Sequence, residues 1–378
     1  MNLLHFTAGY VPGIPTEAIA WHTLVYGARG TKLEVKVPTL TPAQILEVTQ
    51  TVRTATQTQI KNMAVSEIVR AVDLAILKLL DINHPDRKSL DALLPIATGM
   101  DPTMLQHNFS HYLKTFRSLQ LNRFITEDFG NPQLLDAFQP RVTGGWTKAT
   151  GADLITHVWA GNVPGLPLWS LISGLLVKAG TLGKVSGAEP ICASIFAKVL
   201  VDIEPRFANC LSIIWWPTED TQTARQVFQL SDIVLAYGGN DALAAIQSQV
   251  PVTTRFLPHG HKISFAVVTS YALSVVRAKH IAKHAALDIA RYEQQGCYSP
   301  QMFYVERSAQ VSPQEFAQLL ASELAGLAHK YPRSDMTLEE KNNILKWRQS
   351  QEMEMLQDRK STRLNSSHVA LSRMPSSA

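Results

Sequence analysis

Cysteine is scarce in this chain of 378 residues, and its scarcity excludes several classes of protein. The three cysteines, Cys192, Cys210 and Cys297, are odd in number and lack the close spacing of metal ligands. A disulfide framework needs an even and denser set, and a structural zinc site needs tight pairs. The sequence therefore predicts a cytoplasmic protein with reduced cysteines and no metal site.

Long apolar runs are absent as well. The longest one, residues 163–177, contains Pro164 and Pro167 and is shorter than the roughly 20 residues that a membrane helix needs. The amino terminus shows no basic segment followed by an apolar one, so no secretory signal is visible. Because 46% of the residues are hydrophobic, the chain is expected to be a globular enzyme of two or three domains without a membrane span.

A large excess of charge is also missing once the carboxyl-terminal tail is set aside. The formal net charge is +4, but residues 358–378 carry four positive charges and one negative charge, which leaves +1 for the rest. The tail has the residue order of a translated sequencing adapter with a variable index in its middle, so we interpret it as an artefact. A polar natural terminus is the alternative. The remaining charge gives no electrostatic argument for binding nucleic acid.

The first 130 residues predict a mainly helical region that is part of the next domain or packed on it. Short strands are expected up to about residue 40. Thr41 then has the position of a helix N-cap, with Pro42 as the first helical residue. Further helices are expected over residues 68–80 and 103–123.

Residues 131–260 alternate between β-prone runs and helical runs, and we expect them to form one α/β domain. Such alternation predicts a mostly parallel sheet of the nucleotide-binding kind. No Gly-x-Gly-x-x-Gly follows an expected strand, so the usual dinucleotide fingerprint is absent. The expected strands are 154–159, 182–186, 211–216, 233–237 and 263–268, and the expected helices are 168–179, 190–203, 221–230 and a shorter one after Asp241.

The third cysteine lies in the stretch Gln294-Gln295-Gly296-Cys297-Tyr298-Ser299-Pro300-Gln301. Apolar residues recur at helical spacing before it, and Gly296 is expected to end that helix. A β-prone run, residues 302–305, follows. A cysteine at such a junction can be held rigidly and reached by a substrate, although most free cysteines are simply small buried side chains.

Four motifs occur in a characteristic order: Gly161-Asn162-Val163-Pro164, Lys184-Val185-Ser186-Gly187-Ala188-Glu189-Pro190, Gly238-Gly239-Asn240 and Gln295-Gly296-Cys297. Together they resemble the aldehyde dehydrogenase superfamily, and within it the acyl-CoA reductases known from bacterial luminescence. The resemblance covers residues 144–305. It implies an α/β, aldehyde dehydrogenase-like fold with a nicotinamide cofactor domain over residues 131–260. A cysteine-bearing catalytic domain over residues 261–357 would be cut off at Gln357.

The resemblance also implies two catalytic residues. Cys297 would be the nucleophile that forms an acyl-enzyme. Asn162 would donate its amide to the negative charge that develops on the substrate oxygen, a role in which a fixed donor is effective. A turn asparagine is the ordinary alternative for Asn162.

Five further positions would bind the cofactor. Lys184 would contact the adenosine ribose or a phosphate on it, and Ser186 and Glu189 match the following positions of that motif across an insertion. Gly238 and Gly239 would let the pyrophosphate approach the backbone. A surface lysine and an ordinary strand-to-helix turn are the alternatives for Lys184 and for the glycines.

One residue of the hydrolytic aldehyde dehydrogenases is missing. These enzymes carry a glutamate before Gly-Gly-Lys that activates water, whereas this chain has Leu257-Pro258-His259-Gly260-His261-Lys262 without a carboxylate. An acyl-enzyme without that base is hydrolysed poorly and remains available for hydride, so a reductase is favoured. His259 or His261 is a candidate proton donor, although a histidine satisfied by backbone contacts is more common.

The function that the resemblance implies is the reduction of a long-chain fatty acyl-CoA, or an acyl-protein thioester, to a fatty aldehyde. The cofactor would be NADPH, with NADH as the alternative. A homo-oligomer is expected, together with an acyl-activating or acyl-transferring enzyme as partner. Two other functions stay open: an oxidative aldehyde dehydrogenase that uses the same cysteine, and a catalytically silent scaffold subunit whose amino-terminal helices form the interaction surface.

Overall fold

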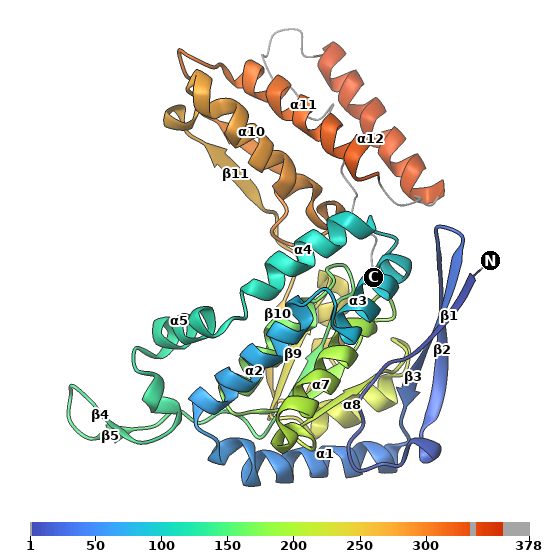
Figure 1. The fold of residues 1–378 in the computed structure, drawn as a ribbon, viewed down its shortest axis with the longest axis vertical. Coiled ribbons are helices and arrows are strands. Elements are labelled where there is room, and N and C mark those ends of the chain that lie inside the picture. The colour runs from blue at the N-terminus through green and yellow to red at the C-terminus, as the bar shows by residue number, and fades with distance from the viewer. Residues whose placement is uncertain (1, 333–337, 358–378) are drawn as a thin grey trace. The chain divides into compact units, whose positions relative to one another are not determined.

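The computed structural model describes residues 2–332 and 338–357, and the chain divides into two compact units (Figure 1). The first unit comprises Met1–Thr98 and Gln106–Gly260, and the second comprises Gly99–Leu105 and the residues from His261 onward. The tail interpreted as translated adapter lies outside the described residues. Among the residues described, no helix combines the length and apolar character needed to cross a membrane.

Three strands open the first unit, as the sequence predicts: β1 (Asn2–Thr7), β2 (Ala20–Ala28) and β3 (Thr31–Thr39). β2 and β3 form an antiparallel hairpin, and β1 pairs with β3 in parallel. Arg29 and Gly30 both have positive φ, the conformation that a two-residue hairpin turn requires. Leu33, Val35 and Val37 on β3 are fully buried, so this sheet packs one face on the unit.

The same amino-terminal segment is bonded to residues far along the chain. Tyr10 exchanges two backbone hydrogen bonds with Ile213, of 2.9 and 2.7 Å. The amide of Gly9 donates to Ser194 Oγ at 2.7 Å, and the amide of Trp215 donates to the Pro38 carbonyl at 3.2 Å. These contacts anchor the first sheet beside the central one.

The central sheet has five parallel strands in the order β10-β9-β6-β7-β8. Four of them are at the places that the sequence predicts: β6 (Leu154–Val158), β7 (Gly180–Lys184), β8 (Leu211–Ile214) and β9 (Ile233–Tyr237). The fifth, β10 (Arg255–His259), is missing from the sequence prediction. It contains Pro258, which an edge strand tolerates because one side of its backbone has no partner in the sheet.

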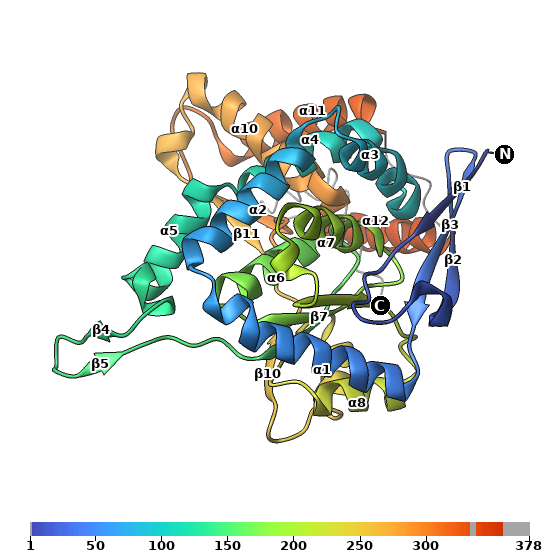
Figure 2. The same cartoon turned by 60° about the horizontal axis from the view of Figure 1, so that its bottom comes forward.

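Helices cover both faces of this sheet (Figure 2). On one face, α1 (Pro42–Thr58), α8 (Thr221–Gln229) and α9 (Asn240–Gln247) share an apolar core with β6–β9. On the other lie α6 (Leu166–Leu176) and α7 (Ile191–Ile203), with α2 (Val65–Leu80) and α3 (Pro85–Thr98) packed on α7. The predicted α/β class with a parallel sheet is therefore confirmed.

For the amino-terminal helices, one prediction is confirmed and another is wrong. Thr41 is the N-cap of α1 and forms a complete capping box with Gln44, as its position predicts. The single helix expected over residues 103–123 is wrong, because α4 (Pro102–Lys114) and α5 (Ser118–Phe129) are separate. Arg117 breaks the run: its backbone is extended, and its side chain pairs with Asp73 at 2.5 Å. A short two-stranded ribbon follows α5, formed by β4 (Gln139–Pro140) and β5 (Trp146–Thr147).

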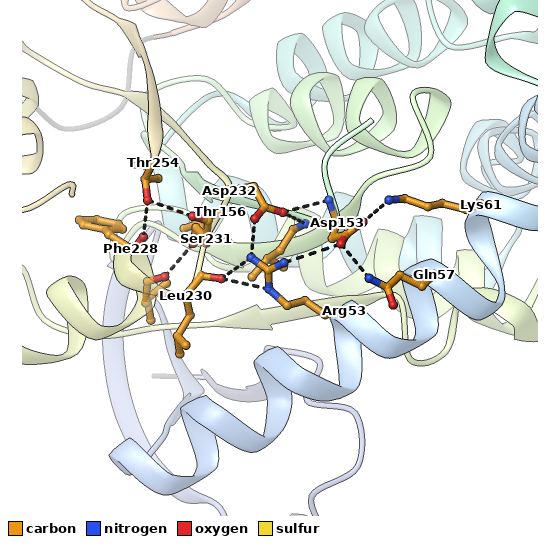
Figure 3. Close-up of polar contacts among 12 residues, drawn as sticks. Arg53, Gln57, Lys61, Asp153, Thr156, Phe228, Leu230, Ser231, Asp232 and Thr254 are labelled. Carbon is orange, nitrogen blue, oxygen red and sulfur yellow. Dashed lines mark hydrogen bonds and ion pairs between the residues drawn. The ribbon is translucent and has the colours of Figure 1, made fainter. Parts of the chain in front are cut away.

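A polar network fixes α1 to the amino ends of two central strands (Figure 3). Asp232 Oδ2 accepts the amides of Asp153 and Leu154, at 3.0 and 2.9 Å, where β6 begins. Arg53 on α1 donates to Asp232 Oδ1 at 2.6 Å, and Lys61 pairs with Asp153. Because the strands are parallel, these contacts at their amino ends leave the carboxyl ends together at the opposite edge of the sheet.

The second unit is a small two-layer domain. β11 (Phe265–Val268) pairs in parallel with β12 (Met302–Val305), and α10 (Val275–Ala290) and α11 (Pro313–Lys330) pack together over an apolar core. α12 (Leu338–Gln357) follows. The run 263–268 therefore contains a strand, but it does not belong to the cofactor sheet with which the sequence analysis grouped it. The β-prone run 302–305 is confirmed as β12.

Candidate active site

Most of the predicted cofactor residues lie at the carboxyl edge of the central sheet. Lys184 ends β7, and Gly238 directly follows β9. The chain leaves β6 at Val158 and reaches Asn162, an exposed residue, four positions later. β6 and β9 are neighbours, and the strand order runs away from them in opposite directions. This is a topological switch point, the place where α/β sheets of this kind bind ligands.

The loops after β6 and β7 approach each other closely at Gly161. A Cβ atom on Gly161 would stand 2.7 Å from both Ser186 Oγ and Ala188 Cβ, closer than real Cβ contacts. Ser186 Oγ in turn accepts the amide of Ala188 at 3.2 Å. The Gly161-Asn162 motif and the Lys184–Glu189 motif are thus brought together by the fold, and glycine is required where they meet.

Lys184 is partly buried, so it is not an ordinary surface lysine. Its Nζ lies 5.6 Å from the centroid of the Trp216 ring, within the range of a cation–π interaction. Burial lowers the pKa of Lys184, and the nearby Glu219 carboxylate acts in the opposite direction. A partly dehydrated ammonium group of this kind attracts an anion more strongly than one surrounded by water.

Glu189 has a structural task in this fold. Its carboxylate accepts the amides of Ile191 and Cys192, both at 2.8 Å, and so caps the first turn of α7. The side chain is 2% exposed, and burial raises its pKa while the amide hydrogen bonds lower it. The contact between Glu189 and a cofactor stays a prediction. Ser186, by contrast, is partly exposed.

Gly238 and Gly239 connect β9 to α9, and the space above them is open. A Cβ atom on Gly239 would meet nothing within 4 Å, and one on Gly238 would meet Ala242 Cβ at an ordinary 3.5 Å. Neither glycine has a positive φ, so the backbone conformation does not demand glycine. What the two residues provide is unobstructed access to the amides at the start of α9.

His259 ends β10 at the same edge and stacks on Tyr237 at the end of β9, with ring centroids 4.8 Å apart. The residues around it, Leu257 to Gly260, bring no carboxylate to this strand end. A separate polar hollow of about 680 Å³ on the first unit is lined by α1 and by residues around Arg206, and none of the predicted site residues lines it. No group of three or more metal-ligating side chains occurs in the described part of the chain.

The second unit carries Cys297, and here the predicted helix end is wrong. α10 ends at Ala290, and a non-helical turn over Arg291–Gln294 follows. Three consecutive residues, Tyr292, Glu293 and Gln294, have positive φ values of 50°, 52° and 64°. Such values are rare for residues other than glycine and cost on the order of 1 kcal/mol or more each. The chain thus leaves its helix through a strained reversal well before Gly296.

Cys297 occupies a corner of the tight turn that comes next. The Ser299 amide donates to the Gly296 carbonyl at 2.9 Å, which places Cys297 and Tyr298 at the two central positions. A Cβ atom on Gly296 would stand 3.1 Å from Ser299 Oγ, so a side chain there would crowd the turn. Below the turn, the buried Gln294 donates to the Pro300 carbonyl at 3.1 Å.

The three cysteines differ sharply in their surroundings. Cys297 is exposed, whereas Cys192 and Cys210 are buried. Burial raises the pKa of Cys192 well above its ordinary value, and burial raises that of Cys210 to about 11. A thiol reacts as its thiolate, so Cys297 is the cysteine that is placed to act as a nucleophile.

Two polar side chains of interest escaped the sequence analysis. Tyr26 on β2 donates its hydroxyl to the Gly187 carbonyl at 2.6 Å and so supports the loop that follows Lys184. Ser264 donates to the Cys297 carbonyl at 2.6 Å. Neither contact has a local sequence signal, because its partners are 161 and 33 residues apart.

Curated relatives match this chain at moderate identity. A long-chain acyl-protein thioester reductase from Photorhabdus laumondii is 28% identical over 220 residues, which cover 57% of this chain and 44% of the relative. One from Photobacterium phosphoreum is 26% identical over 286 residues, covering 74% and 57%. The chain thus spans about half the length of the curated relatives it matches.

Solved structures support the fold. Aldehyde dehydrogenase 21 from Physcomitrella patens has a TM-score of 0.63 at 12% identity, covering 86% of this chain and 64% of that one. An NAD-dependent benzaldehyde dehydrogenase from Corynebacterium glutamicum has a TM-score of 0.64 at 13% identity, covering 84% and 66%. At such identities the likeness establishes an aldehyde dehydrogenase-like fold.

The sequence profile of one family matches most of the chain. It is described as acyl-CoA reductase (LuxC) and matches residues 60–372, a range that contains the motifs from Gly161 to Cys297 and also the first part of the tail. The predicted resemblance is therefore confirmed, and the chain belongs to the LuxC family of acyl-CoA reductases.

Proposed function

We propose that this protein reduces a long-chain fatty acyl thioester to a fatty aldehyde through an acyl-enzyme on Cys297. The observation that carries the proposal is the position of Cys297. The chain belongs to an acyl-CoA reductase family, and Cys297 is the exposed one of its three cysteines. It lies at the corner of a hydrogen-bonded turn. The acyl donor is an acyl-CoA or an acyl-protein thioester, the latter because the matched relatives carry that name.

The first half-reaction is an acyl transfer. The Cys297 thiolate attacks the thioester carbonyl carbon, and a new carbon–sulfur bond forms as the carbonyl oxygen gains negative charge. We assign the stabilisation of that oxygen to the Asn162 amide and the Cys297 backbone amide. The carbon–sulfur bond to the donor then breaks, the donor leaves as a thiolate that takes up a proton, and the acyl group remains on Cys297.

The residues at the carboxyl edge of the first unit fit a nicotinamide dinucleotide. Open backbone at Gly238 and Gly239 suits a pyrophosphate, and the partly dehydrated Lys184 suits the ribose or a phosphate on it. We assign Ser186, on the loop that follows Lys184, to the same contact with the cofactor. We propose NADPH as the preferred form of the cofactor. When bound, the reduced nicotinamide supplies the hydride that converts the acyl group to the aldehyde oxidation level, and Cys297 then leaves as the thiolate.

The absence of a carboxylate in the run from Leu257 to Lys262 favours reduction over oxidation. β10 ends there with His259 stacked on Tyr237, and that strand end offers no carboxylate to activate water. The oxidative aldehyde dehydrogenase is therefore the second candidate. A homo-oligomer and an acyl-activating or acyl-transferring partner remain part of the proposal.

Incubation with a long-chain acyl-CoA should add the mass of one acyl group to the intact protein. Subsequent NADPH should remove that mass and release the aldehyde, whereas buffer alone should leave the adduct in place, because the glutamate that activates water in the hydrolytic enzymes is missing from residues 257–262. Intact-protein mass spectrometry with extraction of the lipid product measures both steps. Rapid acid formation from an aldehyde and NADP⁺ without a thiol acceptor would instead establish the oxidative enzyme.

Replacing Tyr26 with phenylalanine should weaken NADPH binding about threefold to tenfold, since one hydrogen bond that holds the Gly187 carbonyl is lost. The dissociation constant follows from titration of the nucleotide fluorescence. His22, on the same strand and stacked on Trp215 at 4.6 Å, offers a control: His22→Gln should leave the constant closer to that of the wild type. Equal affinity of wild type and Tyr26→Phe would remove Tyr26 from the cofactor site.

A further inference from the structure

We propose that Ser264 is a positioning residue for the cysteine nucleophile, which rests on the proposed role of Cys297. Ser264 immediately precedes β11 and is partly buried. Its Oγ donates to the Cys297 carbonyl oxygen at 2.6 Å, a short and therefore favourable hydrogen bond. The side chain of Ser264 thus binds the backbone of the residue that carries the reacting sulfur.

The backbone of Ser264 contacts the chain just beyond the turn. Its carbonyl oxygen accepts the amide of Gln301 at 2.8 Å. Gln301 immediately precedes β12, and Phe265 is paired with Met302, so this bond extends the β11–β12 ladder by one step. Ser264 therefore binds the turn at Cys297 through its side chain and the residue just beyond the turn, Gln301, through its main chain.

The turn needs such a restraint because of what precedes it. The chain arrives through Tyr292, Glu293 and Gln294 in the left-handed region, a conformation that persists when the surroundings enforce it. Just before the turn, Gln294 is fixed by its side-chain bond to the Pro300 carbonyl. At the exposed corner, the bond from Ser264 is the contact that fixes the peptide group following Cys297.

The expected effect falls on the reaction rate more than on the fold. The hydrogen bond lies at the surface, so water can replace the serine hydroxyl as a donor in its absence. A nucleophile that moves by about 1 Å, however, can lose up to about a hundredfold in rate. A residue that acts by position should therefore change the maximal rate of acylation while leaving the concentration for half-maximal rate nearly unchanged.

The test compares Ser264→Ala, Ser264→Thr and the control Ser308→Ala. Ser308 belongs to the same unit and accepts the amide of Gln310 at 3.2 Å, so it offers a serine of similar setting away from the cysteine. We expect the maximal acylation rate to fall at least about tenfold in Ser264→Ala, and less than threefold in Ser264→Thr and Ser308→Ala. Quenched samples analysed by intact mass against acyl-CoA concentration give both kinetic constants.

Hydrogen exchange of the backbone amides tests the positioning without any reaction. Loss of the Ser264 hydroxyl should accelerate exchange at Ser299 and Gln301 about tenfold, and threonine should restore it. If the wild-type chain forms no acyl adduct, the proposed function fails, and the exchange data still decide the role of Ser264. Unchanged acylation and unchanged exchange in Ser264→Ala would overturn the inference, as would an equal loss in Ser308→Ala.

Discussion

Cys297→Ser is expected to lower the rate of acylation by a long-chain acyl-CoA by at least about a thousandfold. Serine is nearly isosteric, but its hydroxyl is far less ionised than a thiol at neutral pH, and the described surroundings of Cys297 provide no base within the turn. The backbone bonds of the turn do not involve the sulfur, so folding should be unaffected. Intact-protein mass spectrometry and a thermal unfolding curve check both parts.

The other two cysteines provide matched controls. Cys192→Ala and Cys210→Ala remove buried thiols whose pKa values are raised by burial, so neither should change the acylation rate by more than about twofold. Labelling with iodoacetamide at pH 8 should modify Cys297 first and reach the other two after unfolding. An acyl adduct that persists in Cys297→Ser and disappears in Cys210→Ala would show that Cys210, in the first unit, is the nucleophile. That result would refute the proposal.

A second large effect is expected from acid. His157 on β6 is fully buried, and neither ring nitrogen has a hydrogen-bond partner among the described residues. Burial lowers the pKa of His157 to about 3, whereas an unfolded histidine titrates near 6.5. Below pH 6.5, His157 therefore binds a proton in the unfolded chain but not in the folded chain. The free energy of unfolding should fall by about 3 kcal/mol between pH 7.5 and 4.5 on account of this residue.

His157→Leu should abolish that part of the pH dependence. The leucine cannot take up a proton in either state, and it removes two buried polar atoms, so its stability at pH 7.5 should be within about 1 kcal/mol of the wild type. Urea unfolding followed by tryptophan fluorescence at the two pH values measures the difference. Carboxylates titrate in the wild type and in His157→Leu alike, so their contribution to the pH dependence cancels in the comparison. Equal losses in the wild type and His157→Leu would show that His157 has no such role.

Three strands of the central sheet, β6, β7 and β8, could be predicted because they are buried on both faces. β6 to β9 read as short apolar runs between helical ones, and their positions agree with the sequence prediction. β10 could not be found in the same way, because Pro258 and His259 fit an edge strand and no other. The end of α10 could not be predicted from the sequence either. Nothing in Tyr292, Glu293 and Gln294 indicates a left-handed backbone, so Gly296 was the expected helix end.

The site shows a similar division between local and distant causes. Residues at strand ends, such as Lys184 and Gly238, gather at one edge because the strands are parallel, and this follows from the sequence pattern. The sequence could not reveal the surroundings of each side chain. Glu189 caps α7, and Lys184 lies against Trp216. Tyr26 and Ser264 were missed because their hydrogen bonds join distant segments.

The bonds between Tyr10 and Ile213 have a consequence for the order in which the protein folds during its synthesis. At about 5–20 residues per second, a ribosome needs roughly 10–40 s to add the 203 residues that separate these partners. Until then, the amino-terminal sheet can pack on α3, which is made earlier, but it cannot join the central sheet at β8. The first strands made are therefore joined to the central sheet only after most of the first unit has been synthesised.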